Sequence, residues 1–236
     1  MNDLHYLTII GAMKAGTTTL YDLLCQHPQI CRGRRKEPNF FGNDKSWNRE
    51  RKFYNRLWPD FDQEKHKWAL EASTAYTKSH TSKVAKRMSL YGNRFKFVYI
   101  LRNPIDRIRS NFDYNAIKSL QTNVSLPHKI RTSKYASQLD AFCEYHDVAD
   151  ILLVDFEQLV ADQTKVAHDI CRFLSLDHFD FQVVGNRNDT ELQSNVKKRK
   201  FSASEYAYLK QELAPDMKKL HDKYGVNVAN WGFDLR

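Results

Sequence analysis

The sequence lacks any long apolar run. No stretch approaches the roughly 20 consecutive apolar residues that a membrane-spanning helix requires, so we do not expect a transmembrane protein. No cleaved signal peptide is visible either, because the first expected strand begins near Tyr6, too early for a leader. If Met1 is the natural start of the chain, these two absences predict a cytoplasmic protein.

Cysteine is also scarce. The four cysteines, Cys25, Cys31, Cys143 and Cys171, show neither C-x-x-C spacing nor a dense framework, so neither a redox motif nor a disulfide scaffold is expected. We expect Cys25 and Cys143 to be buried free thiols on apolar helix faces. His168 lies one helical turn from Cys171, but no second pair of ligands accompanies them, which disfavours a zinc site.

The sequence does contain enough hydrophobic residues to form a core. The 236 residues are 42% hydrophobic and 13% aromatic, so disorder is not the default, and we expect one α/β domain covering residues 1–236. The net charge of +9 favours anionic partners such as nucleotides, acidic glycans, nucleic acid or membrane surfaces, without choosing among them. We find no internal repeats.

The first 26 residues have the pattern of a phosphate-binding loop. An apolar, β-branched run at 6–10 precedes a loop bounded by Gly11 and Gly16, and leucines at helical spacing follow. In a strand–loop–helix unit of this kind, glycines let the backbone approach an anion, and the helix N-terminus attracts it. The alternative is that the two glycines only form a tight turn.

This loop differs from the P-loop of nucleotide triphosphatases, G-x-x-x-x-G-K-[ST], in one informative way. Gly11 and Gly16 have the P-loop spacing, but Thr17 stands where the P-loop lysine would be. The cation is Lys14, inside the loop. Thr17 can donate a hydrogen bond to an anion but brings no charge.

Strands and helices alternate along the chain. We expect strands at 6–10, 68–71, 95–101 and 151–154, with helices between them, which predicts an α/β, P-loop-like three-layer fold with a central parallel sheet. Residues 121–134 read as an irregular polar connection, and the C-terminal helical region is expected to restart at Pro215. Ligands of such sheets bind beyond the carboxyl ends of the strands. The loops at 11–18, 72–76 and 102–103 should therefore share one rim.

A second anion site is expected where the strongest strand ends. Arg102 follows that strand, and Ser110 lies two helical turns further on. A guanidinium can hold a phosphate through two parallel hydrogen bonds, and a hydroxyl can add a third. The alternative for Arg102 is a surface salt bridge with Asp106. Arg107 and Arg109 are expected on a solvated helix face.

Three motifs together resemble one enzyme family. GAMKAGTTTL around Lys14, LRNPIDRIRS around Arg102 and Ser110, and KEPNFF around Glu37 are similar to sulfotransferases that use 3′-phosphoadenosine 5′-phosphosulfate (PAPS). The similarity is closest to the heparan sulfate-type carbohydrate branch and its bacterial relatives, and it extends from residue 7 to about residue 231. It implies transfer of the sulfuryl group from PAPS to a hydroxyl or amine and release of 3′-phosphoadenosine 5′-phosphate (PAP). A metal is not expected to be essential, because no lysine follows Gly16 and the strongest strand ends in Arg102 rather than in an acidic residue.

The resemblance also implies which residues hold the nucleotide. The first loop would grip the 5′-phosphosulfate through Lys14, Ala15, Gly16, Thr17, Thr18 and Thr19. Arg102 and Ser110 would hold the 3′-phosphate. The basic run Lys197, Lys198 and Arg199 would close over the same nucleotide, although it could equally be an exposed charged loop.

Two residues carry the chemistry that the resemblance implies. Lys14 would stabilise the negative charge that grows on the leaving group. Glu37 would be the base for the acceptor hydroxyl, with an ion pair to a neighbouring arginine as its alternative role. His27 and His66 are alternative bases, as in cytosolic sulfotransferases, but neither lies in a matching motif.

The acceptor is less well defined. Glycosaminoglycan enzymes often carry E-K-[ST]-x-x-Y where this chain has EASTAY at 71–76, so Ala72 replaces the substrate-facing lysine. The arginines at 32, 34 and 35 would suit an acidic or polyhydroxylated acceptor, although they could equally be solvated. We expect a small-molecule or glycan acceptor, with lipid and protein tyrosine as open alternatives; nucleic acid and membrane partners are not expected. A P-loop-type kinase and a non-catalytic nucleotide-binding protein are the alternative functions.

Overall fold

The central element is a parallel β-sheet. The computed structural model describes residues 4–49, 51–78, 80–117, 125–185 and 198–234. These residues form a five-stranded sheet in the order β2-β3-β1-β4-β5, in which every neighbouring pair is parallel. The strands are β1 (Tyr6–Gly11), β2 (Ile30–Arg32), β3 (Trp68–Ala72), β4 (Phe95–Leu101) and β5 (Ile151–Asp155). The predicted fold class is confirmed.

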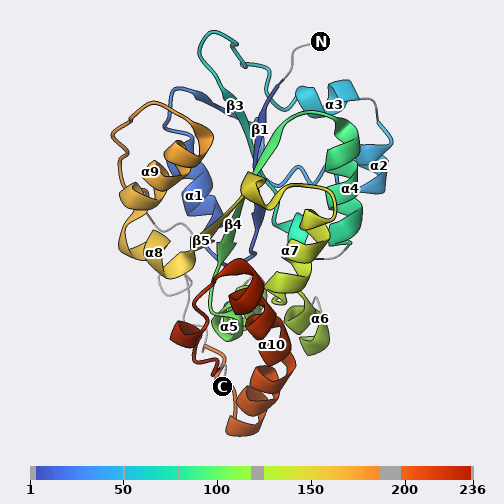
Figure 1. Ribbon diagram of the computed structural model, residues 1–236, viewed down its shortest axis with the longest axis vertical. Coiled ribbons are helices and arrows are strands. Elements are labelled where there is room, and N and C mark those ends of the chain that lie inside the picture. The colour runs from blue at the N-terminus through green and yellow to red at the C-terminus, as the bar shows by residue number, and fades with distance from the viewer. Residues whose placement is uncertain (1–3, 50, 79, 118–124, 186–197, 235–236) are drawn as a thin grey trace.

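Helices cover both faces of the sheet and its carboxyl end (Figure 1). Helices α1, α8 and α9 lie on one face, and α2, α3, α4 and α7 lie on the other. Helices α5, α6 and α10 gather beyond the carboxyl ends of the strands. Their bounds are α1 (Thr17–Leu24), α2 (Asp44–Trp47), α3 (Arg51–Asn55), α4 (Thr81–Tyr91), α5 (Pro104–Ile117), α6 (Leu126–Arg131), α7 (Tyr135–Cys143), α8 (Phe156–Ala161), α9 (Gln163–Leu174) and α10 (Ala203–Tyr224).

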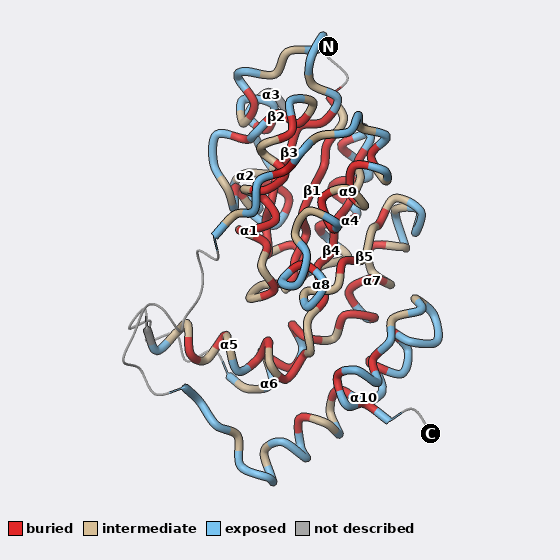
Figure 2. The backbone as a smooth tube through the Cα atoms, turned by 90° about the vertical axis from the view of Figure 1, so that its left-hand side faces the viewer, coloured by how far each residue is buried: buried red, intermediate tan, exposed pale blue. Residues whose placement is uncertain are grey.

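The sheet is buried on both faces, as the continuous apolar runs of its strands require. All six residues of β1 are buried, and Figure 2 shows the buried stretches running through the strands. At the amino end of β1, the ring of Tyr6 contacts those of Tyr54 and Trp58, and its hydroxyl donates to Asn55 Oδ1 at 2.7 Å. This packing holds the sheet rigid while its other end carries the loops.

Two elements were not predicted. Strand β2 has three residues, too few for a periodic pattern, and it was not among the expected strands. Helix α6 forms in the region expected to be irregular, with Pro127 in its first turn, where a missing N–H does no harm. Only Lys129 and Ile130 of α6 are buried, so the helix has no apolar stripe to reveal it.

Helix α10 continues through Pro215, where we expected a restart. Beside the proline, the Asp216 carboxylate accepts hydrogen bonds from the amide N–H groups of Ala136 and Ser137, at 3.0 and 2.9 Å. Asp216 therefore caps the N-terminus of α7 from another helix. This tertiary contact stabilises α10 next to the position where the proline removes a helical hydrogen bond.

The expectation for Arg107 was wrong, and that for Arg109 is confirmed. Arg107 is fully buried: its Nε donates to Ser133 Oγ at 2.7 Å, and its Nη2 donates to the Lys129 carbonyl oxygen at 2.7 Å. Arg109 is exposed and forms an ion pair with Asp106 at 2.7 Å. Arg107 is buried because α6 packs over the face of α5 that would otherwise be solvated.

The cysteines are free thiols, but the two that we expected to be buried are only half-buried. All four cysteines are free thiols; Cys31 and Cys171 are buried, whereas Cys25 and Cys143 are half-buried. Burial raises the pKa of Cys31 and of Cys171 to about 11, so neither is a ready thiolate. Among the helices described here, none is long and apolar enough to cross a membrane.

Arg107→Ala should lower the free energy of unfolding by about 3 kcal/mol, because it removes hydrogen bonds between α5 and the segment around α6 and leaves a cavity. Arg109→Ala, on the same helix, is the control and should change that free energy by less than about 0.5 kcal/mol. Urea denaturation measures both. Equal effects of the two substitutions would contradict the buried role of Arg107.

Candidate functional site

The first loop connects the buried end of β1 to α1. Gly16 precedes α1 and has a φ of 78°, in the left-handed region that favours glycine. A Cβ on Gly16 would also lie 3.2 Å from Leu159 Cδ2 and 3.4 Å from Phe156 Cδ2. As a glycine, Gly16 has no side chain with which to cap the N-terminus of α1. The glycine thus lets the chain turn closely into a helix whose first N–H groups can receive an anion.

Lys14 lies in this loop in an unusual environment. It too has a left-handed backbone, with a φ of 70°, and its Nζ lies 4.1 Å from the ring centroid of Tyr114 on α5. Burial lowers the pKa of Lys14 to about 8, helped by the charge of Arg102 and opposed by Asp113. An anion that enters the loop would therefore stabilise the protonated form of Lys14.

Arg102 connects the first loop to the end of β4. Its Nη1 donates to the carbonyl oxygen of Lys14 at 2.8 Å, and its guanidinium lies over the ring of Phe156, 4.4 Å from the centroid. Its Nε is buried and has no hydrogen-bond partner among the described residues. Asp106, the alternative partner, pairs with Arg109 instead. Arg102 therefore keeps a donor available beside the first loop.

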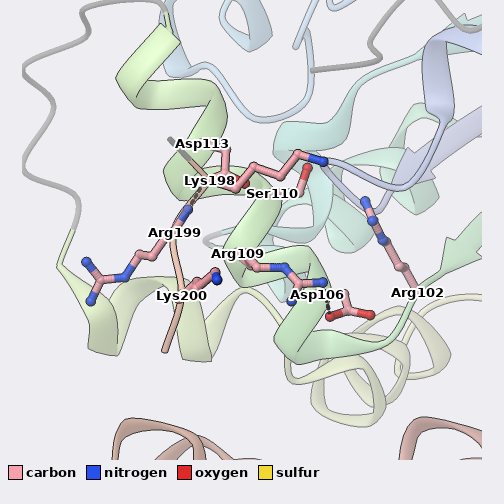
Figure 3. Close-up of a pocket in the computed structure, with 8 residues that line it drawn as sticks. All are labelled: Arg102, Asp106, Arg109, Ser110, Asp113, Lys198, Arg199 and Lys200. Carbon is pink, nitrogen blue, oxygen red and sulfur yellow. Dashed lines mark hydrogen bonds and ion pairs between the residues drawn. The ribbon is translucent and has the colours of Figure 1, made fainter. Parts of the chain in front are cut away.

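A pocket of about 350 Å³ lies beside Arg102, between α5 and the segment at 198–200. Five cationic and two acidic side chains line it: Arg102, Arg109, Lys198, Arg199 and Lys200, with Asp106 and Asp113, and Ser110 completes the lining. In Figure 3 the side chain of Lys198 extends past Ser110 toward the side of Arg102. This excess of positive charge suits a small polyanion.

Arg199 lines the pocket, but its guanidinium points to the opposite side (Figure 3). That group pairs with Glu205 at 2.6 Å and lies over the ring of Phe112. The Arg199 amide N–H donates to Asp113 Oδ1 at 2.8 Å, which anchors the basic segment to α5. Lys197 falls outside the described residues.

Three side chains here were not singled out from the sequence: Asp113, Tyr114 and Lys200. Asp113 and Tyr114 lie three and four residues after Ser110, so helical periodicity places all three on one face of α5. That spacing was the available signal. Lys200 adjoins the predicted basic run, and the pocket includes it.

Glu37 lies beyond the carboxyl end of β3. Its amide N–H donates to the Ala72 carbonyl oxygen at 2.8 Å, and its Oε2 accepts from the Thr74 N–H at 2.9 Å. Lys36 Nζ lies 3.1 Å from the Oε1 of Glu37, so the ion pair that we considered forms with a lysine rather than an arginine. These contacts hold the carboxylate in place. Its side chain remains 41% exposed, so a bound molecule could still reach it.

The two alternative bases lie at the other end of the sheet. His27 is buried before β2, where its Nδ1 accepts from the Gln29 N–H at 3.1 Å. His66 precedes β3, and its Nδ1 accepts from the Asp62 N–H at 2.9 Å. Both histidines therefore face the amino rim, opposite the first loop.

The sequence also matches a known protein family. The sulfotransferase domain family matches residues 5–231, nearly the whole chain. The chain belongs to the sulfotransferase family.

Individual relatives of this sulfotransferase domain are distant. Human heparan sulfate glucosamine 3-O-sulfotransferase 5 is 26% identical over 187 residues, which cover 71% of this chain and 52% of that enzyme. The chain thus spans about half the length of this relative.

Solved structures share the fold. A sulfotransferase from Alicyclobacillus acidocaldarius has a TM-score of 0.77 at 22% identity, covering 96% of this chain and 98% of that one. Mouse sulfotransferase SULT7A1, solved in complex with PAP, has a TM-score of 0.50 at 18% identity, covering 92% of this chain and 66% of that one.

Titration of Lys14 tests the electrostatics of this candidate site. NMR of labelled lysines, with Lys14→Ala to assign the signal, should give a midpoint near pH 8 instead of the ordinary 10.5. Asp113→Asn should lower the midpoint further, because Asp113 favours the protonated form. A midpoint near 10.5 in the unsubstituted protein would show that the amine is well hydrated and contradict the burial.

Proposed function

We propose that this chain is a PAPS-dependent sulfotransferase that moves a sulfuryl group to a hydroxyl or amine acceptor and releases PAP. The observation that carries the proposal is the hydrogen bond from Arg102 to the Lys14 carbonyl oxygen. It joins two cationic sites, the first loop and the pocket on α5, at one rim of the sheet. A nucleotide with anionic groups at both its 5′ and 3′ positions fits such a pair.

The residues present fit PAPS. The buried Nε of Arg102 has no partner among the described residues, and a 3′-phosphate oxygen would supply an acceptor. Ser110 and Lys198 line the same pocket and would complete the 3′-phosphate site. The first loop, from Lys14 to Thr19, would receive the 5′ end at the N-terminus of α1. When bound, PAPS would supply the activated sulfuryl group.

Lys14 and Glu37 would divide the chemistry between them. Like phosphoryl transfer, sulfuryl transfer depends chiefly on positioning and on charge stabilisation. Lys14, as an ammonium in a partly dehydrated loop, would stabilise the charge growing on the leaving-group oxygen. Glu37, which is anchored by Thr74 and still exposed, would accept the proton of the acceptor.

The acceptor class that we propose is a small molecule or a glycan. The human relative is named for glucosamine of heparan sulfate, which supports a sugar hydroxyl. However, Ala72 replaces the lysine of the glycosaminoglycan motif, and its side chain is fully buried. Any charge that recognises an acidic acceptor must therefore come from another position.

Transfer of radiolabelled sulfate from PAPS into an extract of the source cell, with the product identified by mass spectrometry, tests the function. Lys14→Ala and Glu37→Gln should each lower turnover of that acceptor by about a hundredfold or more, because each removes a group that acts in the transition state. Glu37→Gln should leave PAPS affinity nearly unchanged. ATP-dependent labelling that requires Mg²⁺, without transfer from PAPS, would instead identify a kinase.

Arg102→Ala should weaken PAP binding by roughly 10- to 100-fold, the range for losing hydrogen bonds to a charged group. Binding of adenosine 5′-phosphosulfate, which has no 3′-phosphate, should weaken less, only by the amount that the loss of the Arg102 bond to the first loop causes. Isothermal titration calorimetry compares the two ligands. Arg172→Ala, an exposed arginine on α9 that pairs with Asp169, is the control. Equal weakening for both ligands would remove Arg102 from the 3′-phosphate site.

A further inference from the structure

A buried carboxylate lies beneath the loop that carries Glu37. Glu71, on β3, is only 1% exposed, and the proposed chemistry does not use it. Three hydroxyls donate to it: Tyr54 to Oε2, and Ser73 and Tyr76 to Oε1, at 2.7 and 2.6 Å. Burial raises the pKa of Glu71, and the three hydroxyl donors oppose that shift. The carboxylate is therefore an acceptor that orients the hydroxyls around it.

Two of these hydroxyls continue to the Glu37 loop, residues 36–41. The Asn39 amide N–H donates to Ser73 Oγ at 3.0 Å, and the Phe41 amide N–H donates to the Tyr76 hydroxyl at 3.4 Å. Each hydroxyl has one proton, and it donates that proton in its hydrogen bond to Glu71. The oxygen lone pairs are therefore left to accept from the loop. Glu71 thus determines the direction in which Ser73 and Tyr76 can accept.

The Glu37 loop needs such support because its backbone is strained. Glu37 and Asn39 have φ values of 59° and 50°, in the left-handed region that residues with side chains rarely adopt. Conformations of this kind persist only when surrounding contacts enforce them. The bonds at Asn39 and Phe41 supply contacts on the C-terminal side of Glu37, and the bond from the Glu37 N–H to Ala72 supplies one at the residue itself.

We propose that Glu71 is a positioning residue for Glu37. Through Ser73 and Tyr76 it fixes the Glu37 loop, and the loop presents the Glu37 carboxylate in one place beside the rim of the sheet. The inference rests on the proposed function only where it gives Glu37 the role of base. The hydrogen-bond network itself is independent of that role.

The third hydroxyl provides a matched control. Tyr54 also donates to Glu71, but none of the described hydrogen bonds joins its hydroxyl to the backbone of the Glu37 loop. Its ring packs against Phe40 and Phe41, and Tyr54→Phe preserves that packing. Ser73→Ala, Tyr76→Phe and Tyr54→Phe each remove one donor from Glu71, whereas only the first two break a connection to the loop.

Amide hydrogen exchange of the Glu37 loop in the ligand-free protein is the first measurement. Ser73→Ala and Tyr76→Phe should accelerate exchange at Asn39 and Phe41 respectively by about tenfold or more, since each N–H loses its acceptor. Tyr54→Phe should leave both rates within about twofold of the unsubstituted protein. Unchanged exchange in Ser73→Ala and Tyr76→Phe, or equal acceleration in all three, would overturn the proposal.

Turnover is the second measurement, with the acceptor that the unsubstituted enzyme sulfates. Ser73→Ala and Tyr76→Phe should lower kcat by about 10- to 100-fold, with KM for PAPS unchanged, because a small displacement of a catalytic group is costly. Glu71→Gln should retain most of the activity, since its amide oxygen can still accept from Ser73 and Tyr76, whereas Glu71→Leu should not. If Glu37→Gln is inactive but Ser73→Ala and Tyr76→Phe keep the kcat of the unsubstituted enzyme, the positioning role of Glu71 is rejected, and the role of Glu37 as base is retained. An active Glu37→Gln with accelerated loop exchange would reject the base and leave the network intact.

Discussion

The contact between Arg102 and the carbonyl oxygen of Lys14 is the interaction on which the site depends. It ties the end of β4 to the loop that follows β1, two neighbouring strands of the sheet. The two cations are therefore held together although their charges repel. Burial and mutual repulsion lower the pKa of Lys14, and burial lowers that of Arg102. Without an anion, this part of the protein bears an electrostatic penalty that a ligand with two anionic groups would relieve.

The carboxylates near these cations only partly compensate for that penalty. Asp106 is paired with Arg109, and Asp113 accepts the amide N–H of Arg199. Each acidic group is thus engaged in holding α5 or the basic segment, which leaves Arg102 with an unpartnered donor among the described residues. The pocket combines acidic side chains that are already hydrogen-bonded with the Nε of Arg102, which has no partner in the described part of the chain, so an anion can bind there without competing with those carboxylates for this donor.

The sequence predicted the features that periodicity and spacing encode. Continuous apolar runs revealed the central strands, and the two glycines with Lys14 between them revealed the first loop. Arg107 was misplaced because its burial depends on α6, a short helix without an apolar stripe. Tyr114 was missed because its contact with Lys14 requires the distance between α5 and the first loop. Both errors concern contacts between two elements. The residue pattern of one helix or strand carries no information about such contacts.

The segment EASTAY at 71–76 supports the loop that carries Glu37 through its backbone and its polar side chains. The Ala72 carbonyl oxygen accepts the Glu37 N–H, Thr74 binds the Glu37 carboxylate, and Glu71 orients Ser73 and Tyr76. None of these bonds uses the side chain of residue 72, which is enclosed in β3. Because Ala72 is fully enclosed, a longer side chain at this position would have to displace its neighbours in the core. The backbone of residue 72 thus helps to hold the Glu37 carboxylate in place, whereas recognition of the acceptor depends on side chains that reach the surface.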